Sequence, residues 1–304
     1  MSFEKDIFIS YAHIDNESLE EGGKGWIAEF HRALEVRLSQ LLGERPKIWR
    51  DTELDGNHNF NDEIIDQFPK IALFISIVSP RYVKSEWCVK EVVEFKKASE
   101  KNIGVEINNK SRIFKIIKTP IQADNRIPDI DGLLGYEFYQ IDEQTRRVKE
   151  YSKLYGNDVQ HLYWSKLDDV AHDIAELLQE LKTNGVMETS VPQEGPTVYL
   201  AETSSDLNSE RDAIKRWLQD KHCKVLPNRS LSYVASEYAT QVNEMLQECD
   251  FAIHPIGSNY GMILEGDEES KIAVQNKVAA SISEQKGLER IIWMPPTPVS
   301  YTHL

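Results

Sequence analysis

Two residues in the segment SEWCVKEVVEF (85–95), Trp87 and Glu91, stand one helical turn apart. Side chains four residues apart lie next to each other on a helix, so the indole and the carboxylate would be neighbours. One interpretation is a helix edge that meets solvent. The other is one wall of a binding pocket.

The rest of this segment predicts how the helix is held. Ser85 is a candidate N-cap, because its hydroxyl can accept a hydrogen bond from a backbone N–H of the first turn. Cys88, Val92 and Phe95 follow one another by four and three residues and are expected to face a sheet. The aromatic–carboxylate pair forms the neighbouring stripe, so helix geometry alone leaves both interpretations open.

Strand-like runs precede and follow this helix. The run IALFISIVS is apolar on both faces, as expected in the buried middle of a parallel sheet. Helical patterns separate the runs, which predicts βαβ units with helices on both faces of the sheet. A longer helical pattern covers residues 142–183. The predicted strands are residues 6–10, 47–49, 71–79, 112–117 and 136–141.

The pattern starts again after a stretch that contains Gly, Pro and Ser. Four later segments, TVYLAETSSD, KVLPN, FAIHPIGSNY and RIIWMPP, match earlier segments in the same order. Such a repeat favours a duplicated α/β unit, although parallel strands also resemble one another in general. We therefore predict an α/β protein with two flavodoxin-like parallel-sheet domains. The predicted parts are a first domain with C-terminal helices (1–183), a linker (184–196), a second domain (197–298) and a non-native tail (299–304).

Ligands of open parallel sheets bind beyond the C-terminal ends of the strands. This rule nominates three polar segments of the first domain: SYAHID, WRDTELDGNHNF and SPRYVKSEW. The first segment has no glycine, which excludes a G-x-G-x-x-G dinucleotide cradle there, and the chain contains no P-loop motif. A phosphoacceptor receiver domain needs an aspartate at the end of the third strand, and Ser79 stands there instead.

Composition limits the classes of partner. The net charge of −15 disfavours nucleic acids and anionic membranes. Cys88, Cys223 and Cys249 have no C-x-x-C spacing, so neither a zinc site nor a disulfide framework is predicted, and no metal is expected. The N-terminus lacks a secretory signal, and the longest apolar run is too short to span a membrane. We expect a cytoplasmic protein.

Three motifs resemble those of the Toll/interleukin-1 receptor (TIR) family. DIFISYAHIDN is similar to the family's first strand and turn, and KIWRDTELDGNHNFNDEI to its second strand and BB loop. ALFISIVSPRYVKSEWCVKEV resembles the third strand, Ser-Pro turn and third helix of bacterial and plant members. The resemblance covers about residues 5–145. More weakly, residues 197–296 resemble the companion domain that follows TIR modules in some large bacterial NTPase-linked proteins.

This resemblance implies a reaction. Many bacterial and plant TIR proteins cleave NAD+ at the nicotinamide–ribose bond, and the glutamate one turn after the third-helix tryptophan is catalytic. That rule assigns catalysis to Glu91, with Trp87 beside the substrate. NAD+ is then a substrate and no cofactor is needed. The resemblance also implies self-association through TIR domains, activity on assembly, and a role in bacterial defence signalling.

Two further residues are candidates for NAD+ binding. Tyr11 follows the first strand and either lines the nucleotide pocket or is a strand-end aromatic residue. Asp51 opens the BB loop and either binds a ribose or caps its own turn. In the second domain, Gln275 and Asn276 stand where a catalytic glutamate would be expected, so we predict that domain to be non-catalytic. The alternatives for the whole chain are a TIR interaction module without turnover and a nucleotide sensor.

Overall fold

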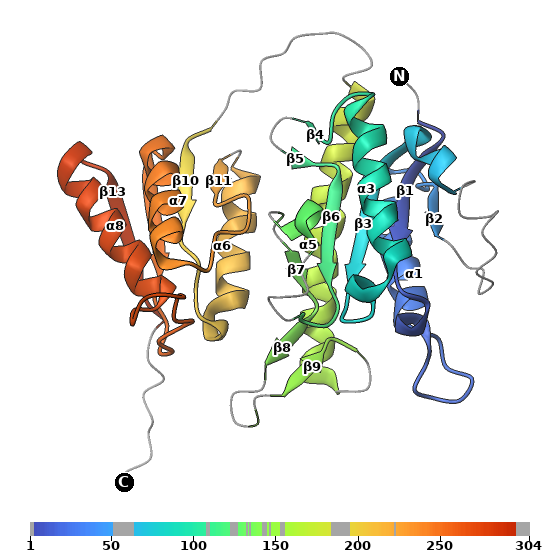
Figure 1. The fold of residues 1–304 in the computed structure, drawn as a ribbon, viewed down its shortest axis with the longest axis horizontal. Helices are drawn as coiled ribbons and strands as arrows, with labels where there is room; N and C mark the ends of the chain where they lie inside the picture. The colour runs from blue at the N-terminus through green and yellow to red at the C-terminus, as the bar shows by residue number, and fades with distance from the viewer. Residues whose placement is uncertain are drawn as a thin grey trace. The chain divides into compact units, whose positions relative to one another are not determined.

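The structure is a computed structural model in which the chain divides into two compact units, Met1–Thr189 and Ser190–Leu304 (Figure 1). Asp51, most of the predicted linker and the predicted tail lie outside the residues it describes. The described residues are 3–50, 64–107, 110–121, 127–131, 133, 135–141, 145, 147–152, 156–183, 195–221 and 223–295.

The first unit is built on a five-stranded sheet in the order β2-β1-β3-β6-β7. Every pair of neighbouring strands is parallel. In chain order this is 2-1-3-4-5, the order of flavodoxin-like folds. The predicted α/β class is therefore confirmed. The strands are β1 (Lys5–Ser10), β2 (Ile48–Arg50), β3 (Ile71–Val78), β6 (Ile113–Ile117) and β7 (Gly135–Glu137).

Helices cover both faces of this sheet because its strands are apolar on both sides. Ile7 and Ile9 pack with α1 (Trp26–Leu42) and α5 (Asn157–Thr183). Phe8 points to the opposite face and packs with α3 (Glu86–Glu100). The alternation follows from the two-residue period of a strand. Shorter elements connect these layers: η1 (His13–Asn16), η2 (Phe68–Lys70), η3 (Tyr82–Lys84), α4 (Pro128–Asp131) and the antiparallel strands β4 (Glu106–Ile107) and β5 (Lys110–Ser111).

Two predictions near the end of the first unit were wrong. The strand predicted at 136–141 is two strands: β7 continues the parallel sheet, and β8 (Tyr139–Ile141) pairs antiparallel with β9 (Val148–Glu150). Between them, Phe138 is fully buried and its backbone N–H bonds to the carbonyl of Ile117. The predicted helical stretch at 142–183 therefore contains a strand, and α5 begins only at Asn157.

The second unit repeats the first four strands of this order. Its sheet runs β11-β10-β12-β13, and all its pairs are parallel. The strands fall on the four segments that matched the first half of the chain. They are β10 (Thr197–Leu200), β11 (Lys224–Leu226), β12 (Phe251–Pro255) and β13 (Glu289–Trp293), with η6 (Ser205–Leu207), α6 (Asn208–Asp220), α7 (Ala235–Glu248) and α8 (Lys271–Lys286) between them. None of the helices in the described ranges is long and apolar enough to cross a membrane.

Candidate functional site

Glu91 of α3 lies against the end of β1. The Ser10 hydroxyl donates a hydrogen bond to Glu91 Oε2 at 2.5 Å, and the Trp87 indole Nε1–H donates to Glu91 Oε1 at 3.0 Å. Glu91 is 3% exposed and Trp87 is half-buried. Each carboxylate oxygen therefore accepts a hydrogen bond from a neutral donor in a place that is nearly closed to water.

A third side chain extends this contact into the core. The Tyr82 hydroxyl lies 2.8 Å from Ser10 Oγ, and Tyr82 is fully buried. A serine hydroxyl carries one proton, and Ser10 directs it to Glu91, so Tyr82 is the donor to Ser10. Burial, with smaller contributions from Cys88 and Glu91, raises the pKa of Tyr82 well above its ordinary value. Tyr82 is therefore a neutral phenol, and its O–H can donate the hydrogen bond to Ser10.

Local sequence explains why these groups meet. Ser10 is the last residue of β1 and, two residues after Phe8, points to the α3 face. The helix α3 starts soon after β3, and its N-cap Ser85 accepts a hydrogen bond from the Cys88 N–H at 3.3 Å. Glu91 therefore stands in the second turn, above the C-terminal ends of β1 and β3. The prediction that Ser85 caps this helix is confirmed.

The sheet-facing stripe of α3 is also as predicted. Cys88, Val92 and Phe95 are buried in the core between α3 and the sheet. Burial, followed by the nearby carboxylate of Glu91, raises the pKa of the Cys88 thiol to about 12. The thiol is therefore neutral at pH 7 and has the character of a core side chain, since the thiolate is the nucleophilic form.

A second polar cluster lies at the ends of β1, β3 and β6. The Ser79 hydroxyl donates to Asp15 Oδ2 at 2.5 Å and accepts from the Tyr82 N–H at 3.0 Å. Lys118 Nζ is 3.9 Å from Asp15 Oδ1 and 2.8 Å from Glu150 Oε2. Burial raises the pKa of Asp15, against the effects of Ser79 and Lys118.

Most of these residues belong to the polar segments predicted to cluster at the strand ends, although the sequence pattern indicates no individual role for them. Ser10 and Asp15 belong to SYAHID, and Ser79 and Tyr82 belong to SPRYVKSEW. The signal was a polar residue placed where an apolar strand ends. Glu150 lies on β9, inside the stretch predicted to be helical, and no pattern in the sequence pointed to it.

The structure brings together two of the four predicted site residues. Trp87 and Glu91 share a hydrogen bond. Tyr11 is 7% exposed and belongs to the core on the α1/α5 face, opposite to the face on which Glu91 lies. Its ring packs edge-on against the His13 imidazole, with 5.4 Å between the ring centroids. Asp51 lies outside the described residues, so its predicted role stays a prediction.

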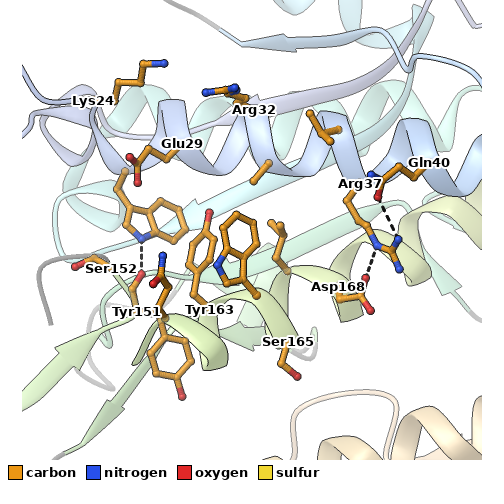
Figure 2. Close-up of a pocket in the computed structure, with 16 residues that line it drawn as sticks. Lys24, Glu29, Arg32, Arg37, Gln40, Tyr151, Ser152, Tyr163, Ser165 and Asp168 are labelled. Atoms are coloured by element: carbon orange, nitrogen blue, oxygen red, sulfur yellow. Dashed lines mark hydrogen bonds and ion pairs between the residues drawn. The ribbon is translucent and has the colours of Figure 1, made fainter. Parts of the chain in front are cut away.

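A hollow of about 860 Å³ lies elsewhere, between α1 and α5 (Figure 2). Trp26 and Tyr163 form part of its apolar wall, and the Trp26 Nε1–H donates to the carbonyl of Tyr151 at 2.9 Å. The Arg37–Asp168 ion pair, at 2.5 Å, joins the two helices beside it. Glu91 does not line this hollow. The hollow and the buried carboxylate are therefore at different places in the unit, and the candidate site is the one that holds the carboxylate.

In the second unit, the helix α8 carries a buried amide that contacts β10. Gln275 of α8 is fully buried, and its Oε1 accepts from the Tyr199 hydroxyl and the Glu202 N–H, both at 3.1 Å. Its Nε2 donates to the carbonyl of Glu202 at 2.5 Å. This side chain therefore binds the Tyr199 hydroxyl and the backbone that follows β10, whereas the hydrogen bonds described above for Glu91 come from side chains.

Within the described ranges, no three His, Cys, Asp or Glu side chains are grouped so that they could hold a metal ion. No family model matches the chain. A search of curated proteins likewise found no match.

Proposed function

We propose that the first unit is an NAD+ glycohydrolase of the TIR type, with Glu91 as its catalytic carboxylate. The observation that carries the proposal is a glutamate that is 3% exposed and held between Ser10 and Trp87 at the C-terminal ends of parallel strands. Burying a carboxylate costs free energy, and ionisable groups in such surroundings cluster at functional sites. The choice of reaction follows from the resemblance of three sequence motifs to those of TIR proteins.

The chemistry needs one carboxylate. Nicotinamide is attached to ribose as a cationic pyridinium, and when the C–N bond breaks the electron pair stays on its nitrogen, so it leaves neutral and needs no general acid. Ordinary glycosidases differ, because they use an acid and a second carboxylate. The ribosyl oxocarbenium that develops is stabilised by the Glu91 carboxylate. Water then adds to the ribose carbon and loses a proton to solvent, which gives ADP-ribose, unless an internal nucleophile closes a cyclic product.

The remaining parts of the proposal follow from the resemblance. We place the protein in the cytoplasm, with activity that rises when TIR domains assemble and a role in bacterial defence signalling. Trp87 packs against the substrate beside Glu91. Tyr11 and Asp51 remain proposed NAD+ contacts. The second unit is proposed to be non-catalytic.

The test is release of nicotinamide from NAD+ by concentrated or tethered protein, with identification of the products. We expect Glu91→Gln to lower the rate by at least about a hundredfold, because it removes the charge that stabilises the transition state. The matched control is Glu94→Gln on the same helix, where the carboxylate pairs with Lys97. Equal inactivity of wild type and Glu91→Gln in assemblies, with no NAD+ binding, would favour an interaction module. Saturable binding without nicotinamide release would favour a sensor.

A further inference from the structure

We propose that Ser10 and Tyr82 are positioning residues for Glu91, forming a relay in which Tyr82 donates to Ser10 and Ser10 donates to the carboxylate. The structural part of this proposal is independent of the reaction. Its catalytic consequence rests on the proposed function.

The geometry of the relay is that of a satisfied, buried chain. The two contacts are 2.8 Å (Tyr82 hydroxyl to Ser10 Oγ) and 2.5 Å (Ser10 Oγ to Glu91 Oε2). All three residues are at most 3% exposed. Hydrogen bonds to an ionised group in such surroundings are short and stronger than neutral ones.

The relay connects the carboxylate to the sheet. Glu91 and Trp87 belong to the same helix, so their contact moves with α3 and cannot fix the carboxylate relative to β1. Ser10 ends β1, and Tyr82 lies in η3 on the path from β3 to α3. The Ser10 hydroxyl therefore holds the carboxylate at a defined place above the strand ends, where the substrate of an open parallel sheet binds.

The relay also affects the protonation of Glu91, because its hydrogen bonds are donated toward the carboxylate. Both Ser10 and Trp87 donate to Glu91, and donors favour the ionised form of a carboxylate. Removing the Ser10 hydroxyl leaves Oε2 without this donor in a buried place. A hydrogen bond to a charged group is strong enough that its loss should raise the pH at which the carboxylate takes up a proton by about one unit or more.

The test reads this protonation without any turnover. The chain has six tryptophans, so a spectrum of the full-length protein with 15N-labelled tryptophan resolves few indole signals, and Trp87→Phe identifies the signal of Trp87. Because the Trp87 indole N–H donates to Glu91, its chemical shift reports the protonation of the carboxylate. We expect this signal to titrate about one pH unit higher, or more, in Ser10→Ala than in wild type.

Two variants make the measurement specific. Tyr82→Phe keeps the ring that fills the core and removes the hydroxyl that donates to Ser10, so it should move the titration in the same direction by less. Ser99→Ala is the matched control, since Ser99 is a buried serine of α3 at 2% exposure whose hydroxyl bonds to no described residue. It should titrate like the wild type. If the Trp87 signal of Ser10→Ala titrates no earlier on acidification than that of wild type, down to the pH at which the fold is lost, the proposal is overturned.

Nicotinamide release separates this proposal from the proposed function. In an active wild type, Ser10→Ala should lower kcat about tenfold or more with KM changed by less than about threefold, and should move the acid limb of the pH profile upward. An unchanged kcat would also overturn the positioning role. If wild type releases no nicotinamide but the titration shifts as expected, the proposed reaction fails and the relay stands as a structural one.

Discussion

The Ser10 hydroxyl and the Glu91 carboxylate meet at 2.5 Å although 81 positions of sequence separate them. One ends a strand and the other stands in the second turn of a helix that covers the same face of the sheet. This contact changes how the α3 segment is interpreted. The aromatic–carboxylate pair is not a helix edge that meets solvent, because the carboxylate is buried against β1.

The indole of Trp87 is predicted to contribute through its N–H as well as its ring. Trp87→Phe keeps an aromatic surface but removes the donor to Glu91 Oε1, so we expect kcat for nicotinamide release to fall about tenfold. Trp87→Ala also removes the ring surface and should raise KM. Steady-state kinetics of both variants checks this. Identical kinetics of Trp87→Phe and wild type would show that the N–H has no role.

The capping serine of α3 is predicted to stabilise the turn that carries Trp87. Ser85→Ala removes the acceptor of the Cys88 N–H and should lower the free energy of unfolding of the first unit by about 1 kcal/mol. Hydrogen exchange of amides in the first turn of α3 should increase. Ser85→Asp keeps an acceptor at the N-cap and should restore protection. A Ser85→Ala variant with unchanged exchange would contradict the prediction.

Much of this fold follows from patterns in the sequence, and the exceptions have physical causes. The predicted strands at 6–10, 71–79 and 112–117 agree with β1, β3 and β6, because continuous apolar runs of that length are typical of buried parallel strands. The prediction at 136–141 was wrong because YEFYQI is rich in aromatic residues and contains no Gly or Pro, so the change of partner strand at Phe138 leaves no mark in the pattern.

The candidate site was predictable only in part. Helix periodicity separated the sheet-facing stripe of α3 from the stripe of Trp87 and Glu91, and the strand-end rule placed both near a ligand. Neither rule identifies a contact between distant segments. The relay from Tyr82 through Ser10 depends on the rotation of α3 and on the register of Ser10 with Ser76 across β1 and β3, and both are set by packing of the whole unit.

His254 is predicted to make the second unit sensitive to acid. It is fully buried in β12, and burial, followed by the nearby Arg290, lowers its pKa to about 4. Because the unfolded chain binds this proton near pH 6.5 and the folded unit only near pH 4, stability present above pH 6.5 is lost as the pH falls through this window. The loss should approach about 3 kcal/mol at pH 4.

The measurement is hydrogen exchange of the β12 amides as a function of pH, corrected for intrinsic exchange. His254→Leu removes the titrating group and should flatten the dependence between pH 6.5 and 4. His161→Gln, at an exposed histidine of the first unit, should leave it unchanged. A His254→Leu variant with the same acid dependence as the wild type would assign the effect to other groups.

Gln275 is predicted to stabilise the second unit and not to be an inactive copy of Glu91. In Gln275→Glu the Nε2 donor to the Glu202 carbonyl is lost, and a carboxylate oxygen faces that carbonyl instead. The Glu202 carboxylate is also close, since the Tyr238 hydroxyl lies within hydrogen-bond distance of both side chains. We therefore expect the free energy of unfolding of this unit to fall by about 2–4 kcal/mol at pH 7. The penalty should shrink on acidification, because a protonated glutamate can donate to the carbonyl again.

Denaturant unfolding, monitored through hydrogen exchange of the β10 amides, measures this change. The control is Gln285→Glu, at an exposed position of the same helix. The same variant tests for catalysis. In a Glu91→Gln background, the additional change Gln275→Glu should not restore nicotinamide release. Residue 275 is buried against the backbone after β10, so a carboxylate there is not presented to a ligand. Recovery of nicotinamide release in the double variant, with stability unchanged, would show instead that the second unit holds a site that differs from the first by a single amide.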